Sequence, residues 1–168
     1  MSNTGPTKQI VWIVGPRSAG KETFIRQLIT NEDLAMQYEL NQPLVASRDS
    51  FLLNDQVASR ESVIDQVKQL IIDNNTVLIK WHYLDSRNNR IEKLKAELPD
   101  VYQRAIVLVI SPQTLSKRLK EKADDKTSKY YDPKLEMIHF QKYLATVYKE
   151  LPVTWSSAEA GKNYGNPI

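Results

Sequence analysis

The sequence predicts an α/β protein, a three-layer α/β/α sandwich built on five parallel strands. Short apolar runs rich in β-branched residues recur along the 168 residues, and amphipathic helical segments separate them. Parallel neighbouring strands need a long connection that usually contains a helix, which this alternation supplies. With 41% hydrophobic residues and no cysteine, the composition excludes a disordered protein, a disulfide scaffold, a cysteine-ligated metal site and thiol catalysis.

The first predicted strand, residues 9–14, is a continuous apolar run of the kind found in strands buried on both faces. It ends at Gly15, and the apolar residues of 20–30 then recur at helical spacing. Asn31 is predicted to close that helix in a left-handed cap. Residues 43–46 form a second, short strand. The chain therefore begins as a strand, a tight loop, a helix and a strand.

A helix over residues 59–73 follows, opened by Ser59 with Ser62 as a second capping candidate. Prolines then mark a helix end or a helix start at three places. The remaining predicted elements are, in order, strand 76–81, helix 86–98, strand 105–110, a helix from 112, a helix from 133 to about 150, and strand 152–155.

The sequence predicts one domain over residues 1–155, and residues 156–168, which are rich in small and polar side chains, as a flexible tail. No apolar run approaches the ~20 residues needed to cross a bilayer. Residues 1–8 lack the apolar region of a signal peptide. We therefore expect a cytoplasmic protein without membrane contact, and the sequence leaves its oligomeric state open.

Positive charge is concentrated in the middle of the chain. Residues 80–130 hold 12 basic and 7 acidic side chains, whereas residues 1–79 hold 7 basic and 9 acidic ones. With a formal net charge of only +3, this distribution favours a small anionic ligand over general adhesion to nucleic acid. A solvated helix face is the alternative explanation.

Residues 15–23 fit the phosphate-loop pattern Gly-X-X-X-X-Gly-Lys-Ser/Thr in everything except its last position. The two glycines permit backbone conformations in which successive N–H groups point at phosphate oxygens. The start of the following helix adds its positive dipole end, and the lysine supplies a cation for the β and γ phosphates. The predicted triphosphate-binding residues are Gly15, Pro16, Arg17, Ser18, Ala19, Gly20, Lys21, Glu22 and Thr23.

The departure from the pattern concerns the metal. Glu22 stands where a Ser or Thr hydroxyl normally reaches Mg²⁺, and Thr23 follows one residue later. A carboxylate is a hard oxygen ligand, but its charge repels phosphates. Three alternatives stay open: Glu22 acts through a water, Thr23 takes over, or the site is impaired.

This loop resembles that of the small P-loop kinases, which include nucleoside monophosphate kinases, ribose bisphosphate kinases and polynucleotide kinases. Some active members also carry an acidic residue followed by Ser or Thr after the motif lysine, as in Glu22-Thr23. The stretch 47–51 (Ser-Arg-Asp-Ser-Phe) resembles the Asn-Arg-Asp-Asp-Tyr segment of 5′-hydroxyl polynucleotide kinases. The resemblance implies a P-loop NTPase fold, ATP and Mg²⁺ as cofactors, and action of Asp49 on the acceptor hydroxyl.

Two further stretches resemble the same kinases. Residues 77–90 are similar to the third strand and the polar, arginine-containing segment after it. Residues 110–122 are similar to the fourth strand and the lid helix, which often contains Arg-Leu-X-X-Arg. Arg118 and Lys122 occupy the two basic positions of that pattern. A lid is accordingly expected around residues 112–133.

These matches give each candidate residue a role. Lys21, Asp49 and Arg118 are the predicted catalytic residues, and Lys122 joins the nucleotide site because it lies four residues from Arg118 on one helix face. The predicted acceptor-binding residues are Arg48, Asp85, Arg87 and Arg90, since guanidinium groups bind phosphate oxygens in pairs. The alternatives are a turn or helix cap for Asp49, and surface ion pairs with Asp85 or Glu92 for the arginines.

The sequence thus predicts a kinase that transfers the γ-phosphate of ATP to a nucleotide, a nucleoside or a phosphorylated sugar. One alternative is a kinase acting on polynucleotide or on modified bases in DNA. The other is a nucleotide-binding module with little or no hydrolysis. Glu22 favours this module, and so does Lys80-Trp81-His82, which stands where a carboxylate is expected at the end of the third strand.

Overall fold

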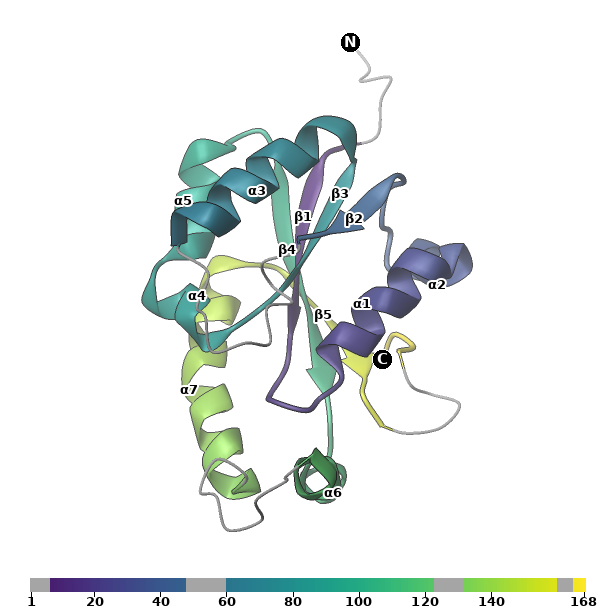
Figure 1. Ribbon diagram of the computed structural model, residues 1–168, viewed down its shortest axis with the longest axis vertical. Coiled ribbons are helices and arrows are strands. Elements are labelled where there is room, and N and C mark those ends of the chain that lie inside the picture. The colour runs from purple at the N-terminus through teal and green to yellow at the C-terminus, as the bar shows by residue number, and fades with distance from the viewer. Residues whose placement is uncertain (1–6, 48–59, 123–131, 160–164) are drawn as a thin grey trace.

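The computed structural model describes residues 7–47, 60–122, 132–159 and 165–168, and it confirms the predicted α/β/α fold with five parallel strands (Figure 1). The sheet has the order β2-β3-β1-β4-β5. Its strands are β1 (Gln9–Val14), β2 (Leu44–Ala46), β3 (Thr76–Lys80), β4 (Tyr102–Val109) and β5 (Val153–Ser157). Because the strand order reverses next to β1, the carboxyl end of β1 is the expected ligand site of such a sheet.

Helices cover both faces of the sheet. They are α1 (Lys21–Thr30), α2 (Glu32–Gln37), α3 (Arg60–Asp73), α4 (Tyr83–Arg87), α5 (Arg90–Glu97), α6 (Pro112–Lys122) and α7 (Pro133–Glu150). Figure 1 shows α3, α5 and α7 on one side of the twisted sheet and α1 with α2 on the other. Across the described parts of the chain, no helix combines the length and apolar character that a membrane crossing requires.

The alternation of side chains along β1 explains the two cores. Ile10 and Trp12 pack in a cluster with apolar side chains of α3, α5 and α7. Val11 and Ile13 pack in a second cluster with side chains of α1, α2 and α6. Successive residues of a strand face opposite sides of the sheet, and all six residues of β1 are buried. The prediction of a strand covered on both faces is confirmed.

The end of α1 differs from the prediction. Asn31 has an extended backbone (φ −120°) instead of a left-handed one, and its side chain accepts a hydrogen bond from the Leu34 N–H at 3.1 Å. Asn31 therefore caps the amino end of α2, a short helix that the sequence analysis missed. Asparagine serves well at either helix end, so the residue type alone does not decide between them.

The predicted helix 86–98 is also wrong as one element. It is divided into α4 and α5 by Asn89, which has a left-handed backbone (φ 53°). Asparagine adopts this conformation more readily than most residues that carry a side chain. Arg87 ends α4 and Arg90 begins α5, so the two arginines do not share a helix face as their spacing suggested.

The described parts of residues 156–168 differ from the expected tail. Ser156 and Ser157 belong to β5, and residues 165–168 lie along the edge of this strand. The main-chain N–H of Ser157 donates a hydrogen bond to the Asn166 carbonyl. The buried Tyr38 hydroxyl lies 2.7 Å from Ser156 Oγ and donates to the Gly165 carbonyl at 2.6 Å. Hydrogen bonding of β5 and of Tyr38 thus holds the described carboxyl-terminal residues on the domain.

The Tyr38 hydroxyl gives a test of this attachment. Tyr38→Phe removes the donor and leaves the Gly165 carbonyl without it, so we expect the free energy of unfolding to fall by about 1–3 kcal/mol. Urea denaturation measures the change. Tyr148→Phe is the matched control, because Tyr148 is exposed on α7. Equal stabilities of Tyr38→Phe and the control would contradict the assigned contacts.

Candidate phosphate-binding site

The turn from β1 to α1 is a tight loop at the carboxyl edge of the sheet. At Gly15 an added Cβ would come within 3.1 Å of Ala19 Cβ and 3.3 Å of Leu108 Cβ, so a side chain there requires displacement of its neighbours. Gly20 has a left-handed backbone (φ 94°) directly before α1. Both motif glycines therefore occupy positions that favour the absence of a side chain.

Ser18, inside the loop, is a non-glycine residue with positive φ (65°). Its Oγ is buried and makes no hydrogen bond in the structure as described. A buried hydroxyl without a partner costs free energy, and the strained backbone adds to that cost. Backbone strain and an unsatisfied buried polar group are both features that indicate a functional site.

Lys21 folds back over the loop. Its Nζ donates to the carbonyl oxygens of Gly15 at 2.7 Å and Pro16 at 3.1 Å. These carbonyls satisfy N–H groups of the ammonium without cancelling its charge. The structure thus places a cation directly over the turn that precedes α1, whose amino end has a positive dipole.

Arg118 reaches the loop from α6. One guanidinium nitrogen donates to the Ala19 carbonyl at 3.0 Å and the other to the Ala158 carbonyl at 2.6 Å. This arginine therefore joins α6, the loop and the residue after β5. Of the predicted lid around 112–133, residues 123–131 and the Lys122 side chain lie outside the described part of the chain.

Glu159 holds the start of α6 beside that contact. Its carboxylate accepts from the Ser111 N–H and the Thr114 hydroxyl. These two hydrogen bonds lower the pKa of Glu159, so it stays ionised and caps the positive end of the helix. Sequence reasoning missed this residue because it assigned Glu159 to a tail.

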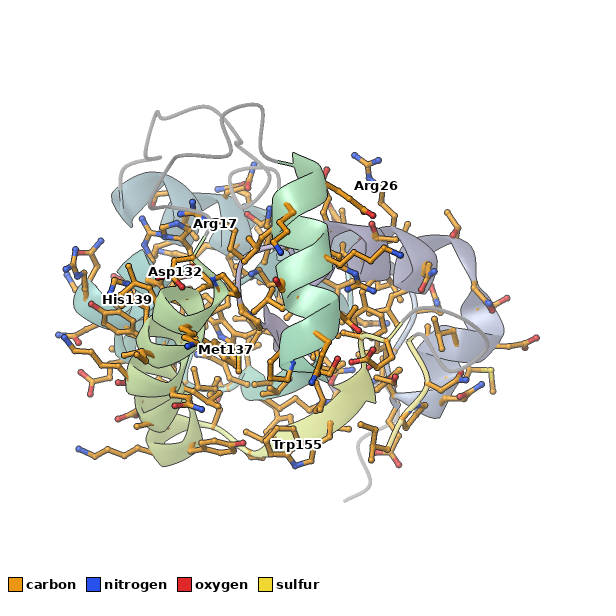
Figure 2. All side chains as sticks on the ribbon, turned by 90° about the horizontal axis from the view of Figure 1, so that it is seen from below. Arg17, Arg26, Asp132, Met137, His139 and Trp155 are labelled. Carbon is orange, nitrogen blue, oxygen red and sulfur yellow. The ribbon has the colours of Figure 1, made fainter. Side chains whose placement is uncertain are left out.

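Glu22 and Thr23 both lie in the first turn of α1, and Thr23 is exposed. The Glu22 carboxylate forms an ion pair with Arg26, one helical turn later, at 2.7 Å. Surface pairs of this kind contribute only about 0.3–0.5 kcal/mol, so the side chain can exchange Arg26 for another partner at little cost. Figure 2, seen from below, shows Arg26 and Arg17 on opposite sides of α6.

The carboxyl end of β3 contains a buried ion pair. Asp85 Oδ1 binds Arg90 at 2.9 Å, with the Asp85 side chain 2% and the Arg90 side chain 7% exposed. Asp85 Oδ2 also accepts from the His82 N–H at 2.5 Å. Sequence analysis left open an acceptor-binding role or a surface ion pair for these residues. The structure shows that Asp85 and Arg90 form an ion pair, and that this pair is buried.

Burial raises the pKa of Asp85 to about 6, against the opposing effects of the His82 hydrogen bond and the Arg90 charge. Because this value lies above the ordinary 3.8, the folded protein binds the proton more tightly than the unfolded chain does. The contribution of Asp85 to the free energy of unfolding therefore falls as the pH rises from about 4 to about 6 and is constant above that range.

His82 lies next to this pair and is surrounded by positive charge. Partial burial lowers its pKa, and the charges of Lys21, Arg17, Arg90 and Lys80 lower it further. The imidazole is therefore neutral at pH 7. These four charges come from α1, from the loop, from α5 and from β3.

Arg87 is exposed and contacts α7. Its Nε lies 3.2 Å from the Tyr143 hydroxyl, and its guanidinium carbon lies 6.0 Å from the centre of that ring. Of the other residues expected on the acceptor side, Arg48 and Asp49 lie outside the described residues. The structure therefore brings Lys21, Arg118 and the loop together, separates Arg87 from Arg90, and leaves Asp49 as a prediction.

No protein-family model and no curated protein matches the chain. Among solved structures, it is similar to shikimate kinase from Bacteroides thetaiotaomicron, with TM-score 0.52 and 13% identity over 89% of this chain and 86% of that one. It is also similar to a gluconokinase from Sinorhizobium meliloti 1021, with TM-score 0.50 and 10% identity over 90% and 84%. The chain has the fold of the small P-loop kinases. At these identities the likeness concerns the fold alone.

The residues of the loop fit the phosphates of a nucleoside triphosphate. The unpaired Ser18 Oγ and the positive φ of Ser18 and Gly20 are features of a loop shaped around an anion. For Mg²⁺, the described residues contain no group of three or more acidic or histidine side chains that could hold a metal ion. Magnesium at phosphate sites needs only one or two protein oxygens, because phosphates and water supply the rest. Glu22 and Thr23 are the residues that would hold it.

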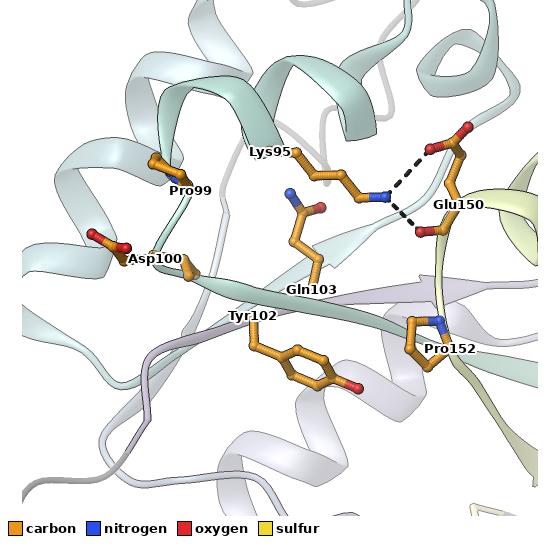
Figure 3. A pocket seen from close by; sticks show the side chains of 8 residues that line it. Lys95, Pro99, Asp100, Tyr102, Gln103, Glu150 and Pro152 are labelled. Carbon is orange, nitrogen blue, oxygen red and sulfur yellow. Dashed lines mark hydrogen bonds and ion pairs between the residues drawn. The ribbon is translucent and has the colours of Figure 1, made fainter. Parts of the chain in front are cut away.

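A separate pocket of about 430 Å³ lies at the other end of the sheet (Figure 3). It is lined by Tyr102 and Gln103 at the beginning of β4, and by Lys95, whose Nζ donates to the Glu150 carbonyl at 2.6 Å. Ligands of open α/β sheets bind at the carboxyl ends of the strands. This pocket is therefore distinct from the phosphate loop.

The buried ion pair predicts a clear difference between single and double substitutions. Asp85→Ala leaves Arg90 buried without its carboxylate, so we expect the free energy of unfolding to fall by about 3–5 kcal/mol. Replacing both residues, Asp85→Leu with Arg90→Met, removes both charges and is expected to cost much less. Urea denaturation at pH 7.5 compares the variants. A fully stable Asp85→Ala protein would show that the pair does not hold the fold.

Proposed function

We propose that the protein is a kinase that transfers the γ-phosphate of ATP to a small acceptor with an anionic group, such as a nucleotide or a phosphorylated sugar. The observation that carries the proposal is the geometry of residues 15–21. There Lys21 Nζ lies on the carbonyls of Gly15 and Pro16, beside a buried Ser18 hydroxyl without a partner. The kinase-like fold supports the same class of reaction.

In this proposal the residues of the chain have separate roles in phosphate binding, charge neutralisation and acceptor orientation. Mg·ATP, when bound, supplies the transferable phosphoryl group. The N–H groups of the loop and of the first turn of α1 bind phosphate oxygens, and Lys21 neutralises charge that develops on the transferred group. Arg118 adds a second cation and keeps α6 against the loop. The roles of Asp49 in orienting the acceptor hydroxyl, and of Arg48 and Lys122 in binding phosphates, belong to this proposal.

Charge at the end of β3 supports an anionic acceptor. Lys21, Arg17 and Lys80 all act on His82, and Asp85 is engaged by Arg90. Positively charged side chains around a binding site raise the local concentration of anionic substrates. Arg87, which is exposed, remains an acceptor-binding candidate. Asp85 and Arg90 contribute indirectly, by fixing the backbone at His82.

A second candidate function is a nucleotide-binding module that transfers no phosphate. Two observations favour it. Glu22 occupies the position of the metal-binding hydroxyl and is paired with Arg26. The end of β3 offers Lys80, Trp81 and His82, and the next carboxylate, Asp85, is buried in its ion pair.

Transfer of labelled phosphate from ATP distinguishes these functions. The acceptor panel contains nucleosides, nucleotides, phosphorylated sugars, neutral sugars and oligonucleotides. We expect label on a small anionic acceptor, and Lys21→Ala should lower the rate about 10²–10³-fold, because the ammonium acts on charge in the transition state. Label on oligonucleotides alone would indicate a polynucleotide kinase. ATP-dependent thermal stabilisation without any labelled product would indicate the binding module.

The metal role of Glu22 is tested by magnesium titration. Because Glu22 occupies the motif position, we expect Glu22→Ala to raise the Mg²⁺ concentration needed for half-maximal activity about tenfold. Glu22→Ser, which supplies the usual hydroxyl, should bring this concentration back to the wild-type value. Thr23→Val tests the other candidate metal ligand, and Thr30→Val, at the far end of α1, is the control. A larger effect of Thr23→Val than of Glu22→Ala would transfer the metal role to Thr23.

A further inference from the structure

A carboxylate on α7 joins three elements around the phosphate loop. Glu136, in the first turn of α7, accepts the main-chain N–H of Arg17 at 2.7 Å, and the same oxygen accepts the Tyr83 hydroxyl. Arg17 lies in the loop, and Tyr83 begins α4 three residues after the end of β3. Glu136 is only 7% exposed, so its two donors replace water as its hydrogen-bond partners.

Tyr83 is itself fixed in place. Its ring packs edge-on against Trp81, with centroids 5.3 Å apart, and stacks on Tyr143 of α7 at 5.3 Å. Burial and the hydrogen bond to Glu136 raise the pKa of the Tyr83 hydroxyl, which therefore remains a donor at every physiological pH. The position of Glu136 is thus determined from the side of β3 as well as by α7.

The start of α7 is also anchored. Asp132 accepts hydrogen bonds from the N–H groups of Lys134 and Leu135 and so caps the helix. Phe140, four residues after Glu136, packs 6.3 Å from Trp81, centre to centre. In the view of Figure 2, Arg17 and Asp132 are both seen at the beginning of this helix, where Glu136 accepts the Arg17 N–H. Glu136 therefore projects from a rigid support towards the loop.

We propose that Glu136 is a positioning residue of the phosphate site: by binding the Arg17 N–H and the Tyr83 hydroxyl with one carboxylate oxygen, it fixes the loop against α4 and α7. This inference rests on the proposed function. With its N–H held, Arg17 extends towards the end of β3, where its charge acts on both His82 and Tyr83. Glu136 thereby sets the relation between the nucleotide side and the acceptor side.

The test compares Glu136→Ala, which removes the acceptor, with Glu136→Gln, whose carbonyl still accepts both hydrogen bonds. Calorimetry measures the Kd for ATP, and labelled-phosphate transfer measures kcat and KM. We expect Glu136→Ala to weaken ATP binding about tenfold and to lower kcat/KM by up to about 10²-fold, as misplacement of reacting groups does. Glu136→Gln should recover most of both losses.

Tyr83→Phe keeps the ring packing and removes one donor, so it remains informative if Glu136→Ala does not fold. It should give a smaller loss in the same direction. Glu150→Gln is the matched control, since Glu150 lies at the opposite end of α7 and contacts Lys95. We expect no change in ATP binding or transfer for this variant.

The calorimetric measurement separates the two proposals. If the wild-type protein binds ATP and labels no acceptor, the kinase proposal fails while the effect of Glu136 on ATP affinity is still measured. Wild-type ATP affinity in both Glu136→Ala and Tyr83→Phe would overturn the positioning role. Equal losses in Glu136→Gln and Glu136→Ala would overturn it too, because a carbonyl acceptor would then not be sufficient.

Discussion

The turn at Gly15 packs tightly against the rest of the domain, and the arrangement of the site depends on that contact. An added Cβ at Gly15 would meet Ala19 from the loop and Leu108 from β4, so the turn lies pressed against the neighbouring strand. In this position the Gly15 carbonyl accepts a hydrogen bond from Lys21, and the Ala19 carbonyl accepts one from Arg118. A loop displaced outwards would lose both cations together, because each is bound to main-chain atoms of the turn.

The cations of the site differ in what they bind. Lys21 and Arg118 donate to main-chain carbonyls of the loop, which orient the two cations. Arg26 and Arg90 bind carboxylates. The first two cations therefore hold the loop and α6 together, while the two arginines form ion pairs on the helix surface and in the interior. Whether an arginine here binds a carbonyl or a carboxylate depends on its place in the fold and not on its residue type, since Arg118 binds carbonyls whereas Arg26 and Arg90 bind carboxylates.

Much of the fold was predictable because buried strands and helices have apolar residues at characteristic spacings in the sequence. The apolar run of β1, and the loop and helix that follow it, appear in the sequence as they appear in the structure. Local features that depend on partners distant in the sequence were not predictable. Asparagine adopts both extended and left-handed conformations, so the residue type alone did not predict that Asn31 is extended and Asn89 left-handed. Glu136 lies 119 residues from Arg17 along the chain, so no local spacing could have joined them.

The break at Asn89 shows how one backbone angle changes the interpretation of a basic stretch. On an unbroken helix, Arg87 and Arg90 would lie on the same face and bind one phosphate together. The left-handed residue between them ends α4, and α5 then begins with Arg90 in contact with Asp85 inside the protein. Arg87 stays at the surface beside Tyr143. Arg90 thus became part of the support at the end of β3. The other charges that act on His82 there include those of Arg17, Lys21 and Lys80, which the fold brings together from the loop, α1 and β3.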